Sequence, residues 1–599
     1  MGRKCVPYGY AGNIARVDLN RKRFIKNETD GKLIKSYVGG KGFGTWFLRN
    51  ENNKPVNPLD PSNILVFSVG PATGTTFPTA SRYGVFFRSP QTGVYGESYS
   101  GGSFAPELKS AGFDVVIVEG RAEVPTYLFL HDGEVEFRED QTLWGLDTYE
   151  TQDRIKKDLG DSKVKTAAIG PAGERLVKFA CICNDYWRQA GRCGAGAVMG
   201  SKRLKAVAVR GTGKFETAYP DELAAFARDF ARSIRKDPAL GTTYPKYGTP
   251  ALVNMTNLAG VFPTRYWSSG QFKKYEEINA ESLRQKILVS SRACLGCPIG
   301  CGKLTEVKDG PYRGTRVEGP EFETIYVFGG LCEIDDLRAI AKMNDICDRL
   351  GMDTITAGNV VAFAIEAYRR GKLQSERPLE YGDPEVVLDL LGKIAARQGL
   401  GDVLAEGVRR ASEVLALEDI AVHVKGLEPA GYDPRGLKGM ALAYGTSSRG
   451  ACHLRSTEYI FELRGVLDRS TTAGKAAIVK EYEDRFAMFD SLILCRFLRD
   501  VVDWNVMAKL CRLITGLDYD ERKLRSVAER VVSQSRLFNV KLGVRKKDDY
   551  LPKRLMAEPL ADGPSKGQSI SKSDMDTMLD EYYRLRGWDR DGVPVEDDN

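Results

Sequence analysis

The stretch Arg292-Ala-Cys-Leu-Gly-Cys-Pro-Ile-Gly-Cys-Gly302 places Cys294, Cys297 and Cys301 in a Cys-x2-Cys-x3-Cys pattern. Glycines and a proline among the thiols indicate a tight turn that folds around a ligand. Three thiolates that converge on one point favour a soft metal ion or an iron–sulfur cluster. A [4Fe–4S] cluster takes four ligands, so a fourth must come from elsewhere in the chain. The stretch therefore predicts a redox protein.

Other roles for these thiols are less favoured. A structural zinc site usually has a second Cys-x2-4-Cys pair or histidines at helical spacing, whereas His131, His423 and His453 are scattered. Reduced structural cysteines rarely have this spacing. A disulfide framework is not expected, because 12 cysteines in 599 residues are sparse and the N-terminus has no apolar segment for secretion. The expected location is cytoplasmic.

The composition, 42% hydrophobic and 28% charged, is that of an ordinary globular protein. A chain of 599 residues is too long for one core, so several domains are expected. The net charge of +7 is small for this length, and basic residues alternate with acidic ones at 228–237 and 521–530. Such stretches are typical of solvated helix faces, so no nucleic-acid partner is expected. No apolar run is long enough to predict a membrane span.

The residue pattern changes near Thr212. Before it, short β-branched and aromatic runs bounded by Gly, Pro and Asn predict strands at 63–70, 83–88, 114–119, 126–131, 134–139, 165–170 and 205–210. Helices are predicted there at 33–50 and 148–159. After it, apolar residues three and four positions apart predict helices at 221–237, 335–350, 356–370, 384–397, 402–415, 476–489, 504–515, 521–538 and 573–586. Asp221 and Asp335 are candidate N-caps.

The predicted fold class is therefore α+β with three domains. A β-rich N-terminal domain covers residues 1–212, and a mainly α-helical domain with the cysteine motif covers residues 213–425. A second mainly helical domain covers residues 426–599.

The residues alone leave the fourth thiol open. Some cysteines fall at apolar helix positions, where a small buried hydrophobe is expected: Cys332, Cys347 and Cys511. Further candidates lie in the N-terminus, in a strand-like run and after an amphipathic helix: Cys5, Cys181, Cys183 and Cys495.

Two glycine-rich segments, 93–102 and 184–200, permit close approach of a phosphate to the backbone. Arg188 and Arg192 in the second segment supply matching charge. Gly194-x-Gly196 is not a dinucleotide fingerprint, because the third glycine comes one residue late and no acidic residue follows at the expected distance. The segments predict a phosphate-bearing ligand other than NAD.

Taken in order, several segments from about Gly9 to Trp588 resemble the tungsten-containing aldehyde ferredoxin oxidoreductase family. They are Ser81-Arg-Tyr83, Ala105-Pro-Glu-Leu-Lys-Ser-Ala-Gly-Phe-Asp114, Ile169-Gly-Pro-Ala-Gly-Glu174, Ala190-Gly-Arg-x-Gly-x-Gly-Ala-Val-Met-Gly-Ser-Lys202, Cys297-Pro-Ile-Gly-Cys-Gly302, Glu318-Gly-Pro-Glu-Phe-Glu323, Cys347-Asp-Arg-Leu-Gly-Met-Asp353, Tyr432-Asp-Pro-Arg-Gly436 and Arg449-Gly-Ala-Cys-His453. So many ordered matches make a chance resemblance implausible.

This resemblance implies a β-rich saddle that carries one tungsten with two pyranopterin-dithiolene molecules, closed over by helical domains, with one [4Fe–4S] cluster nearby. Molybdenum could take the place of tungsten, because no ligand side chain need distinguish them. The implied cluster ligands are Cys294, Cys297, Cys301 and Cys495. The implied pterin-contacting positions are Arg82 (between pterin and cluster), Tyr99, Gly101, Arg188, Gln189, Gly191, Arg192, Asp348, Met352, Asp353, Ser448, Arg449, Arg455, Asp490 and Arg496.

Arginine forks suit the pterin phosphates, and aspartates suit ring N–H donors. In the family, Mg²⁺ bridges those phosphates and is held partly by backbone carbonyls. Tyr99 and Gln189 depart from the family pattern, which has Asn and Ala there. Some dimeric members hold an interface iron with a Glu-x-x-His motif, but the matching stretch here is Lys342-Met-Asn-Asp345. No interface metal is predicted, and a homodimer is left open.

The implied reaction oxidises a small aldehyde with water to a carboxylic acid and passes electrons through the cluster to ferredoxin or a related iron–sulfur acceptor. Glu323 and His453 match the family's active-site residues. Together they are the expected proton-handling pair, because a carboxyl in a dry pocket has a raised pKa and an imidazole titrates near neutrality.

Three alternatives are weighed against this function. Within the family, a benzoyl-CoA-reductase-like catalytic subunit reduces aromatic rings, but Ser81-Arg-Tyr83 and the Glu323–His453 pair favour aldehyde oxidation. Molybdopterin oxidoreductases carry a similar cysteine motif near the N-terminus, not in mid-chain. A different class is a non-catalytic electron-transfer or structural zinc protein, which would contain zinc without tungsten or iron.

Overall fold

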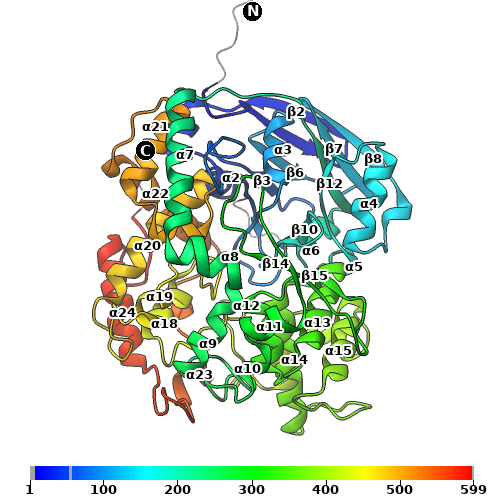
Figure 1. Cartoon of the computed structure of the whole chain (residues 1–599), viewed down its shortest axis with the longest axis vertical. Coiled ribbons are helices and arrows are strands. Elements are labelled where there is room, and N and C mark those ends of the chain that lie inside the picture. Colours follow the sequence, from blue (N-terminus) through cyan, green and yellow to red (C-terminus); the bar gives the residue numbers. More distant parts are fainter. Residues whose placement is uncertain (1–6, 53–56, 596–599) are drawn as a thin grey trace, which may run out of the picture.

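The computed structural model describes residues 7–52 and 57–595. Most strands lie in the first third of the chain and most helices in the rest, so the β-rich part occupies one end of the molecule (Figure 1). Two six-stranded sheets have the orders β2-β1-β6-β3-β4-β5 and β11-β10-β9-β12-β7-β8. Their strands are β1 (Asn13–Asp18), β2 (Arg23–Glu28), β3 (Leu65–Ser68), β4 (Tyr83–Arg88), β5 (Tyr95–Ser100), β6 (Val115–Glu119), β7 (Thr126–His131), β8 (Glu134–Glu139), β9 (Lys165–Ala168), β10 (Ile182–Asn184), β11 (Arg188–Ala190) and β12 (Leu204–Arg210).

The two sheets share one core. Phe67 of the first sheet and Val207 of the second belong to the same buried cluster as Leu108 of α3 (Phe104–Ser110). Side chains alternate between the two faces of a strand, so Ala206 and Ala208 of β12 turn to a second cluster beneath α4 (Thr148–Asp158). Burial on both faces explains why β12 is a continuous apolar run apart from Lys205 and the final Arg210.

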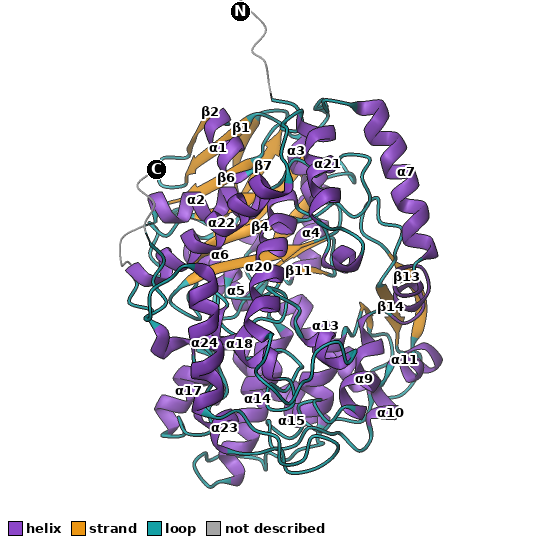
Figure 2. Ribbon diagram, turned by 90° about the vertical axis from the view of Figure 1, so that its left-hand side faces the viewer, coloured by secondary structure: helices purple, strands orange, loops and turns teal. Residues whose placement is uncertain are grey.

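The helices cover the outer face of the first sheet and build the rest of the molecule, as Figure 2 shows. Their bounds are α1 (Gly31–Tyr37), α2 (Gly40–Glu51), α5 (Pro171–Glu174), α6 (Ala195–Ser201), α7 (Pro220–Lys236), α8 (Tyr244–Tyr247), α9 (Leu252–Leu258), α10 (Tyr275–Ile278), α11 (Ala280–Lys286), α12 (Phe322–Ile325), α13 (Leu337–Leu350), α14 (Thr354–Arg369), α15 (Pro384–Ala396), α16 (Leu400–Leu404), α17 (Val408–Leu415), α18 (Lys438–Thr446), α19 (Tyr459–Leu463), α20 (Lys475–Leu492), α21 (Trp504–Thr515), α22 (Glu521–Lys541), α23 (Lys553–Ala557) and α24 (Lys572–Arg586). Across 7–52 and 57–595, none of them has both the length and the apolar character to cross a bilayer.

A third, small antiparallel sheet interrupts the helices. It consists of β13 (Leu288–Arg292), β14 (Gly302–Glu306) and β15 (Arg316–Glu318) in that order. The cysteine motif is the connection between β13 and β14. These strands were not predicted from the sequence, nor were β1, β2, β5 and β11. The glycine-rich segment 93–102, for which the sequence predicts no strand, has the buried strand β5 at its centre.

Some helix predictions were also wrong in detail. The predicted helix 33–50 is two helices, because Val38 and Gly39 break it. The predicted helix 402–415 is likewise two, α16 and α17, separated at Gly407. The N-cap of α7 is Tyr219, with Asp221 in the first turn, and the N-cap of α13 is Asp336 instead of Asp335.

Glycines at the start of α2 bring this helix against the end of α20. A Cβ on Gly40 would lie 2.1 Å from the backbone oxygen of Asp490. Two residues on, the Gly42 N–H donates to the Ser491 hydroxyl at 3.2 Å. The chain leaves α20 at Leu492 and reaches Cys495 three residues later. This contact therefore determines where Cys495 lies relative to the β-rich part.

We predict that Gly40→Ala lowers the free energy of unfolding by about 1–3 kcal/mol, because the added methyl group meets a backbone oxygen. The positive φ of Gly40, +41°, adds strain for a residue with a Cβ. Gly31→Ala is the matched control, because a Cβ there meets nothing within 4 Å. Urea unfolding monitored by circular dichroism measures both variants. Equal midpoints for the two would contradict the close approach of α2 to α20.

Candidate functional site

A cavity of about 400 Å³ brings together residues of the sheets and of the helices. All four predicted cluster thiols line it: Cys294, Cys297, Cys301 and Cys495. Ten further predicted positions line the same cavity: Arg82, Tyr99, Gly101, Arg188, Gln189, Gly191, Glu323, Asp348, Met352 and Asp353. The residues come from widely separated stretches of the chain, so the cavity exists only in the folded protein.

The cysteine loop is held against the β-rich part by its backbone. The Leu295 N–H donates to the Gly102 carbonyl at 3.2 Å, and the Gly296 carbonyl accepts from the Thr79 N–H at 3.4 Å. A Cβ on Gly101 would lie 2.8 Å from the Cys294 sulfur, so only glycine fits there without moving the thiol.

A buried lysine organises the other end of this loop. The Lys303 ammonium donates to the carbonyls of Tyr244, Gly300 and Cys301 at 3.1, 3.1 and 3.0 Å. Backbone carbonyls that all turn toward one cation leave the adjoining side chains free to face the cavity. The lysine therefore helps to aim Cys301 into the cavity.

Burial affects the ionisation of three of the four thiols. Among the described residues, no group of three or more His, Cys, Asp or Glu side chains is arranged to hold one metal ion. Burial, reinforced by neighbouring Cys495, raises the pKa of Cys297 to about 11, and burial also raises the pKa of Cys301 and Cys495. Thiols in such a place ionise only when they bind a positively charged group, which is what a metal cluster supplies.

The predicted fourth ligand is the cysteine that joins the trio at the cavity. Cys332, Cys347 and Cys511 are buried in the core instead. The thiols of Cys181 and Cys183 lie close to the Gln189 side-chain oxygen, at 3.1 and 2.6 Å, and do not line the cavity. Cys5 lies outside the described residues.

Most of the remaining predicted positions form a buried network behind the cavity wall. Its centre is the fully buried carboxylate of Glu97, which accepts from Lys41 at 3.0 Å and from Arg455 at 2.9 Å. Arg455 also donates to Asp490 at 2.8 Å, and Asp490 pairs in turn with Arg496. The family motifs named the arginines and Asp490 but not Glu97 and Lys41, because Glu97 in β5 shows no motif.

Neighbouring positive charges determine the protonation state of Glu97. Burial alone would raise the pKa of Glu97, but the positive charges of Arg455, Lys41 and Arg449 outweigh it and hold the pKa well below its usual range. Glu97 is therefore ionised at any physiological pH, and the network keeps an excess of positive charge.

The arginines retain capacity to bind an anion. In the described part of the chain, the buried Nε atoms of Arg449 and Arg455 have no acceptor. Arg82 lines the cavity and makes no ion pair or hydrogen bond with a described residue; its guanidinium lies over the Tyr99 ring at 5.8 Å. Buried donors without acceptors are rare in native proteins, and here they fit an anionic ligand.

The other predicted polar positions are mostly paired within the protein. The Asp348 carboxylate accepts from Gln189 and Asn344, both at 2.9 Å, and burial together with Asp345 raises its pKa. Asp353 accepts from Arg192 at 3.1 Å and also caps α14, so the helix-cap role and a place at the cavity coexist.

Two further predicted positions also pair with protein side chains. Arg188 pairs with Glu318 at 2.5 Å, and Ser448 contacts Ser535 at 2.9 Å. Lys342 of the Lys-Met-Asn-Asp stretch pairs with Asp345 at 3.3 Å.

Glu323 lines the cavity, and its carboxyl meets His453, which is not one of the lining residues. Their Oε1 and Nε2 atoms lie 3.4 Å apart, and Glu323 Oε2 accepts from the Gly431 N–H at 3.0 Å. Within the described residues, Glu323 Oε1 and His453 Nδ1 are buried without a hydrogen-bond partner. Such atoms are costly in a folded protein, so they are expected to bind a ligand.

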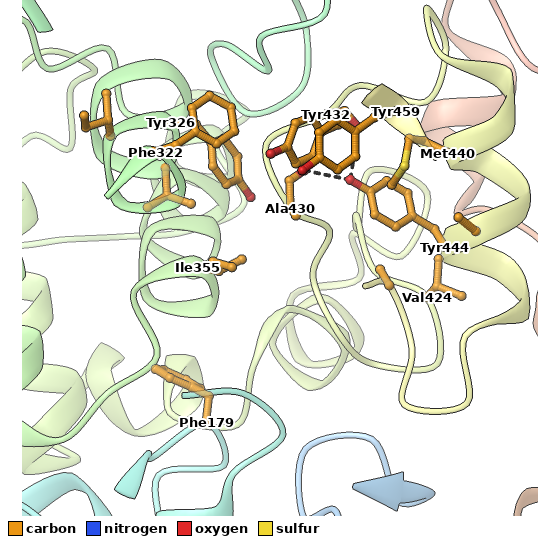
Figure 3. Packing of buried hydrophobic residues seen from close by; sticks show 14 of the residues in the cluster. Phe179, Phe322, Tyr326, Ile355, Val424, Ala430, Tyr432, Met440, Tyr444 and Tyr459 are labelled. Atoms are coloured by element: carbon orange, nitrogen blue, oxygen red, sulfur yellow. Dashed lines mark hydrogen bonds between the residues drawn. The ribbon is translucent and has the colours of Figure 1, made fainter. Parts of the chain in front are cut away.

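Buried tyrosines hold the turn at Gly431, whose N–H binds Glu323. Figure 3 shows Tyr432, Tyr444 and Tyr459 beside Ala430. The Tyr444 hydroxyl donates to the carbonyls of Ala430 and Tyr432 at 3.0 and 3.1 Å, on both sides of Gly431. The Tyr432 ring stacks on Tyr459 at 3.8 Å and lies 5.6 Å from the His453 ring. The turn that binds Glu323 therefore has little freedom to move.

Burial sets the charge of both groups. It raises the pKa of Glu323 to about 8, and the neighbouring charge of Asp353 adds to the shift. It lowers the pKa of His453 well below its usual value, helped by the charges of Arg192 and Arg449. At neutral pH a protonated carboxyl thus faces a neutral imidazole, which is a donor beside an acceptor.

Comparisons with known proteins agree with one another. The family "Aldehyde ferredoxin oxidoreductase, N-terminal domain" matches residues 14–211, and "Aldehyde ferredoxin oxidoreductase, domains 2 & 3" matches residues 225–598. The tungsten-containing aldehyde ferredoxin oxidoreductase of Pyrococcus furiosus is 39% identical, over 98% of this chain and 98% of its own. The WOR-like subunit of an aliphatic sulfonate oxidoreductase from the same organism is 30% identical, over 98% of this chain and 96% of its own.

One solved structure with the same fold is the active site complex BamBC of benzoyl coenzyme A reductase. It superposes with a TM-score of 0.85 at 25% identity, covering 98% of this chain and 96% of that chain. The family resemblance and the α+β class with a β-rich N-terminal part, both expected from the sequence, are confirmed.

We predict that the Glu323 carboxyl ionises with a midpoint near pH 8, because burial raises its pKa to about 8. The unfolded carboxyl ionises near 4.5, so the free energy of unfolding falls as pH rises between these values. Infrared difference spectra between pH 7 and pH 9 measure the loss of the protonated-carboxyl band. The band should be absent in Glu323→Gln; a change of equal size in that variant would assign it to another group.

Proposed function

The chain belongs to the aldehyde ferredoxin oxidoreductase family, and we propose that it oxidises aldehydes to carboxylic acids at a tungsten bis-pyranopterin centre and passes the electrons to ferredoxin. The observation that supports this most is that Glu323, which lines the same cavity as the four thiols, is paired with His453. The pair offers a proton donor and a proton acceptor next to a place built for a redox cofactor.

The residues around the cavity fit the proposed cofactors. The four thiols would hold a [4Fe–4S] cluster, and Arg82, Arg449 and Arg455 would bind anionic groups of the pterins, whose phosphate charge Mg²⁺ would also balance. When bound, the metal centre supplies a Lewis acid and a two-electron acceptor, and the cluster passes the electrons on singly. Molybdenum could replace tungsten in this role.

The protein's own groups handle the protons of the reaction R–CHO + H₂O → R–COOH + 2 H⁺ + 2 e⁻. The protonated Glu323 carboxyl donates a hydrogen bond to the aldehyde oxygen and makes the carbonyl carbon more electrophilic. The neutral His453 imidazole accepts a proton from the water that adds to that carbon. The surrounding tyrosines exclude bulk water, which strengthens both interactions.

Two related activities are alternatives, because the chain is also similar to a sulfonate oxidoreductase subunit and to a benzoyl coenzyme A reductase complex. The higher identity, 39%, is to aldehyde oxidoreductases. The test is purification without oxygen, measurement of W, Mo, Fe and Zn, and an assay of aldehydes, aliphatic sulfonates and benzoyl-CoA with a viologen dye. Aldehyde-dependent dye reduction with tungsten and iron present is expected. Zinc without tungsten or iron, or turnover of benzoyl-CoA alone, would refute the proposal.

Glu323→Gln should retain metal and iron and lose about 10²–10⁴-fold in kcat, because the amide cannot exchange a proton. Metal analysis and dye-coupled aldehyde oxidation measure the two properties. Glu321→Gln is the control, since Glu321 lines the same cavity but contacts Thr249 and not His453. It should keep kcat within about threefold. Near-normal turnover of Glu323→Gln would remove Glu323 from the mechanism.

A further inference from the structure

The loop that carries Cys294 and Cys297 separates two hollows in the protein. On the inner side both thiols line the cavity described above. On the outer side the same two residues line an open groove of about 450 Å³, whose other wall is α7. Figure 2 shows α7 and the hairpin of β13 and β14 at one edge of the molecule. A group bound by these thiols would therefore lie one loop away from the surface.

The α7 wall of the groove has a defined chemistry. Ala224, Ala227 and Ala231 make a shallow apolar floor, and Arg228 and Arg235 stand on the same wall. Positions seven apart fall on one side of a helix, so both guanidinium groups are directed along the same edge. Small side chains at the floor let another surface come close to the cysteine loop.

The charged residues that line the groove are all positive. Its lining includes Arg228 and Arg235 and no acidic residue. Neither arginine forms a side-chain hydrogen bond or ion pair with any described residue, whereas Arg232 on the same helix pairs with Asp229 at 2.5 Å. Asp221 and Glu222 lie at the far N-terminal end of α7. Exposed cations without partners attract an anionic surface.

The cysteine loop itself presents an apolar tip. Leu295 is 56% exposed, among the most exposed large hydrophobic residues that the structure describes. Gly296 beside it is also exposed, and a Cβ added there would meet nothing within 4 Å. An apolar centre flanked by charge is the arrangement of many protein interfaces.

We propose that this groove, formed by α7 and residues 294–298, is the docking surface for a small acidic iron–sulfur protein of the ferredoxin class. The inference rests on the proposed function and adds to it the site where electrons leave. The partner's acidic residues would contact Arg228 and Arg235, and its cluster edge would approach Leu295. Electron-transfer partners bind transiently through small interfaces, for which a shallow groove with steering charge is sufficient.

The test reverses the charge of the groove. Arg228→Glu/Arg235→Glu should raise the KM for an acidic ferredoxin about ten- to a hundredfold, because electrostatic steering contributes factors of that size. Aldehyde oxidation with a viologen dye should stay within about twofold, since a small dye needs no docking surface. The wild-type rate with ferredoxin should fall with added salt, and the rate of the variant should respond weakly.

The matched control is Arg584→Glu/Arg590→Glu, which changes the net charge equally. Both residues are exposed and form no side-chain hydrogen bond or ion pair with a described residue. Arg584 belongs to α24 and Arg590 follows it, on the opposite side of the molecule from α7 (Figure 2). This variant should keep the KM for ferredoxin within about twofold. If the KM for ferredoxin rises equally in both variants, the effect comes from net charge and the proposed docking surface is overturned.

Direct binding separates this proposal from the proposed function. Titration calorimetry of the purified holoprotein with oxidised ferredoxin needs no turnover, so it applies even if no aldehyde is oxidised. Binding that is lost in the groove variant and kept in the control supports the surface. Unchanged binding or an unchanged KM overturns it, as does a change in oligomeric state of the groove variant, which would assign the groove to a second copy of the chain. If the charge reversal loses iron, Arg228→Gln/Arg235→Gln decides by the same measurements.

Discussion

The buried carboxylate of Glu97 is the interaction on which the rest of the structure depends. It lies in β5 and pairs with Lys41 of α2 and with Arg455 from the C-terminal third of the chain. A buried charge without a partner would be too costly, so the folded protein must keep all three together. Arg455 also pairs with Asp490 near the end of α20, so the same network positions the segment that leads to Cys495.

Two buried glutamates have different protonation states because their surroundings differ. Glu97 faces three cations and stays ionised, whereas Glu323 faces aromatic rings and a neutral histidine and has a pKa of about 8. The first holds the arginines that would bind an anionic cofactor, and the second can exchange a proton at neutral pH. The contrast arises from neighbours and not from residue type, as is typical of sites that combine structure with acid–base chemistry.

The cavity and the outer groove are both lined by the cysteine loop. Glu323 and the four thiols line the same cavity, and two of these thiols, Cys294 and Cys297, also line the groove. In the proposed function, the substrate would react in the cavity and the electrons would leave through the cysteine loop. Close contacts, such as that of Gly101 with Cys294, hold the cysteine loop against the β-rich part.

The sequence by itself determined the local features: β7 and β8, which have the predicted bounds, helices such as α21, and the spacing of the three mid-chain thiols. The family motifs also named the arginines, Glu323, His453 and Cys495. Only the tertiary structure decided that Val38 and Gly39 break a helix, that Lys303 aims Cys301, that Glu97 pairs with Arg455, and that the thiol loop borders a basic groove. Periodicity and turn chemistry act between neighbours in the chain, whereas burial, pKa and ion pairing depend on residues that folding brings from far away.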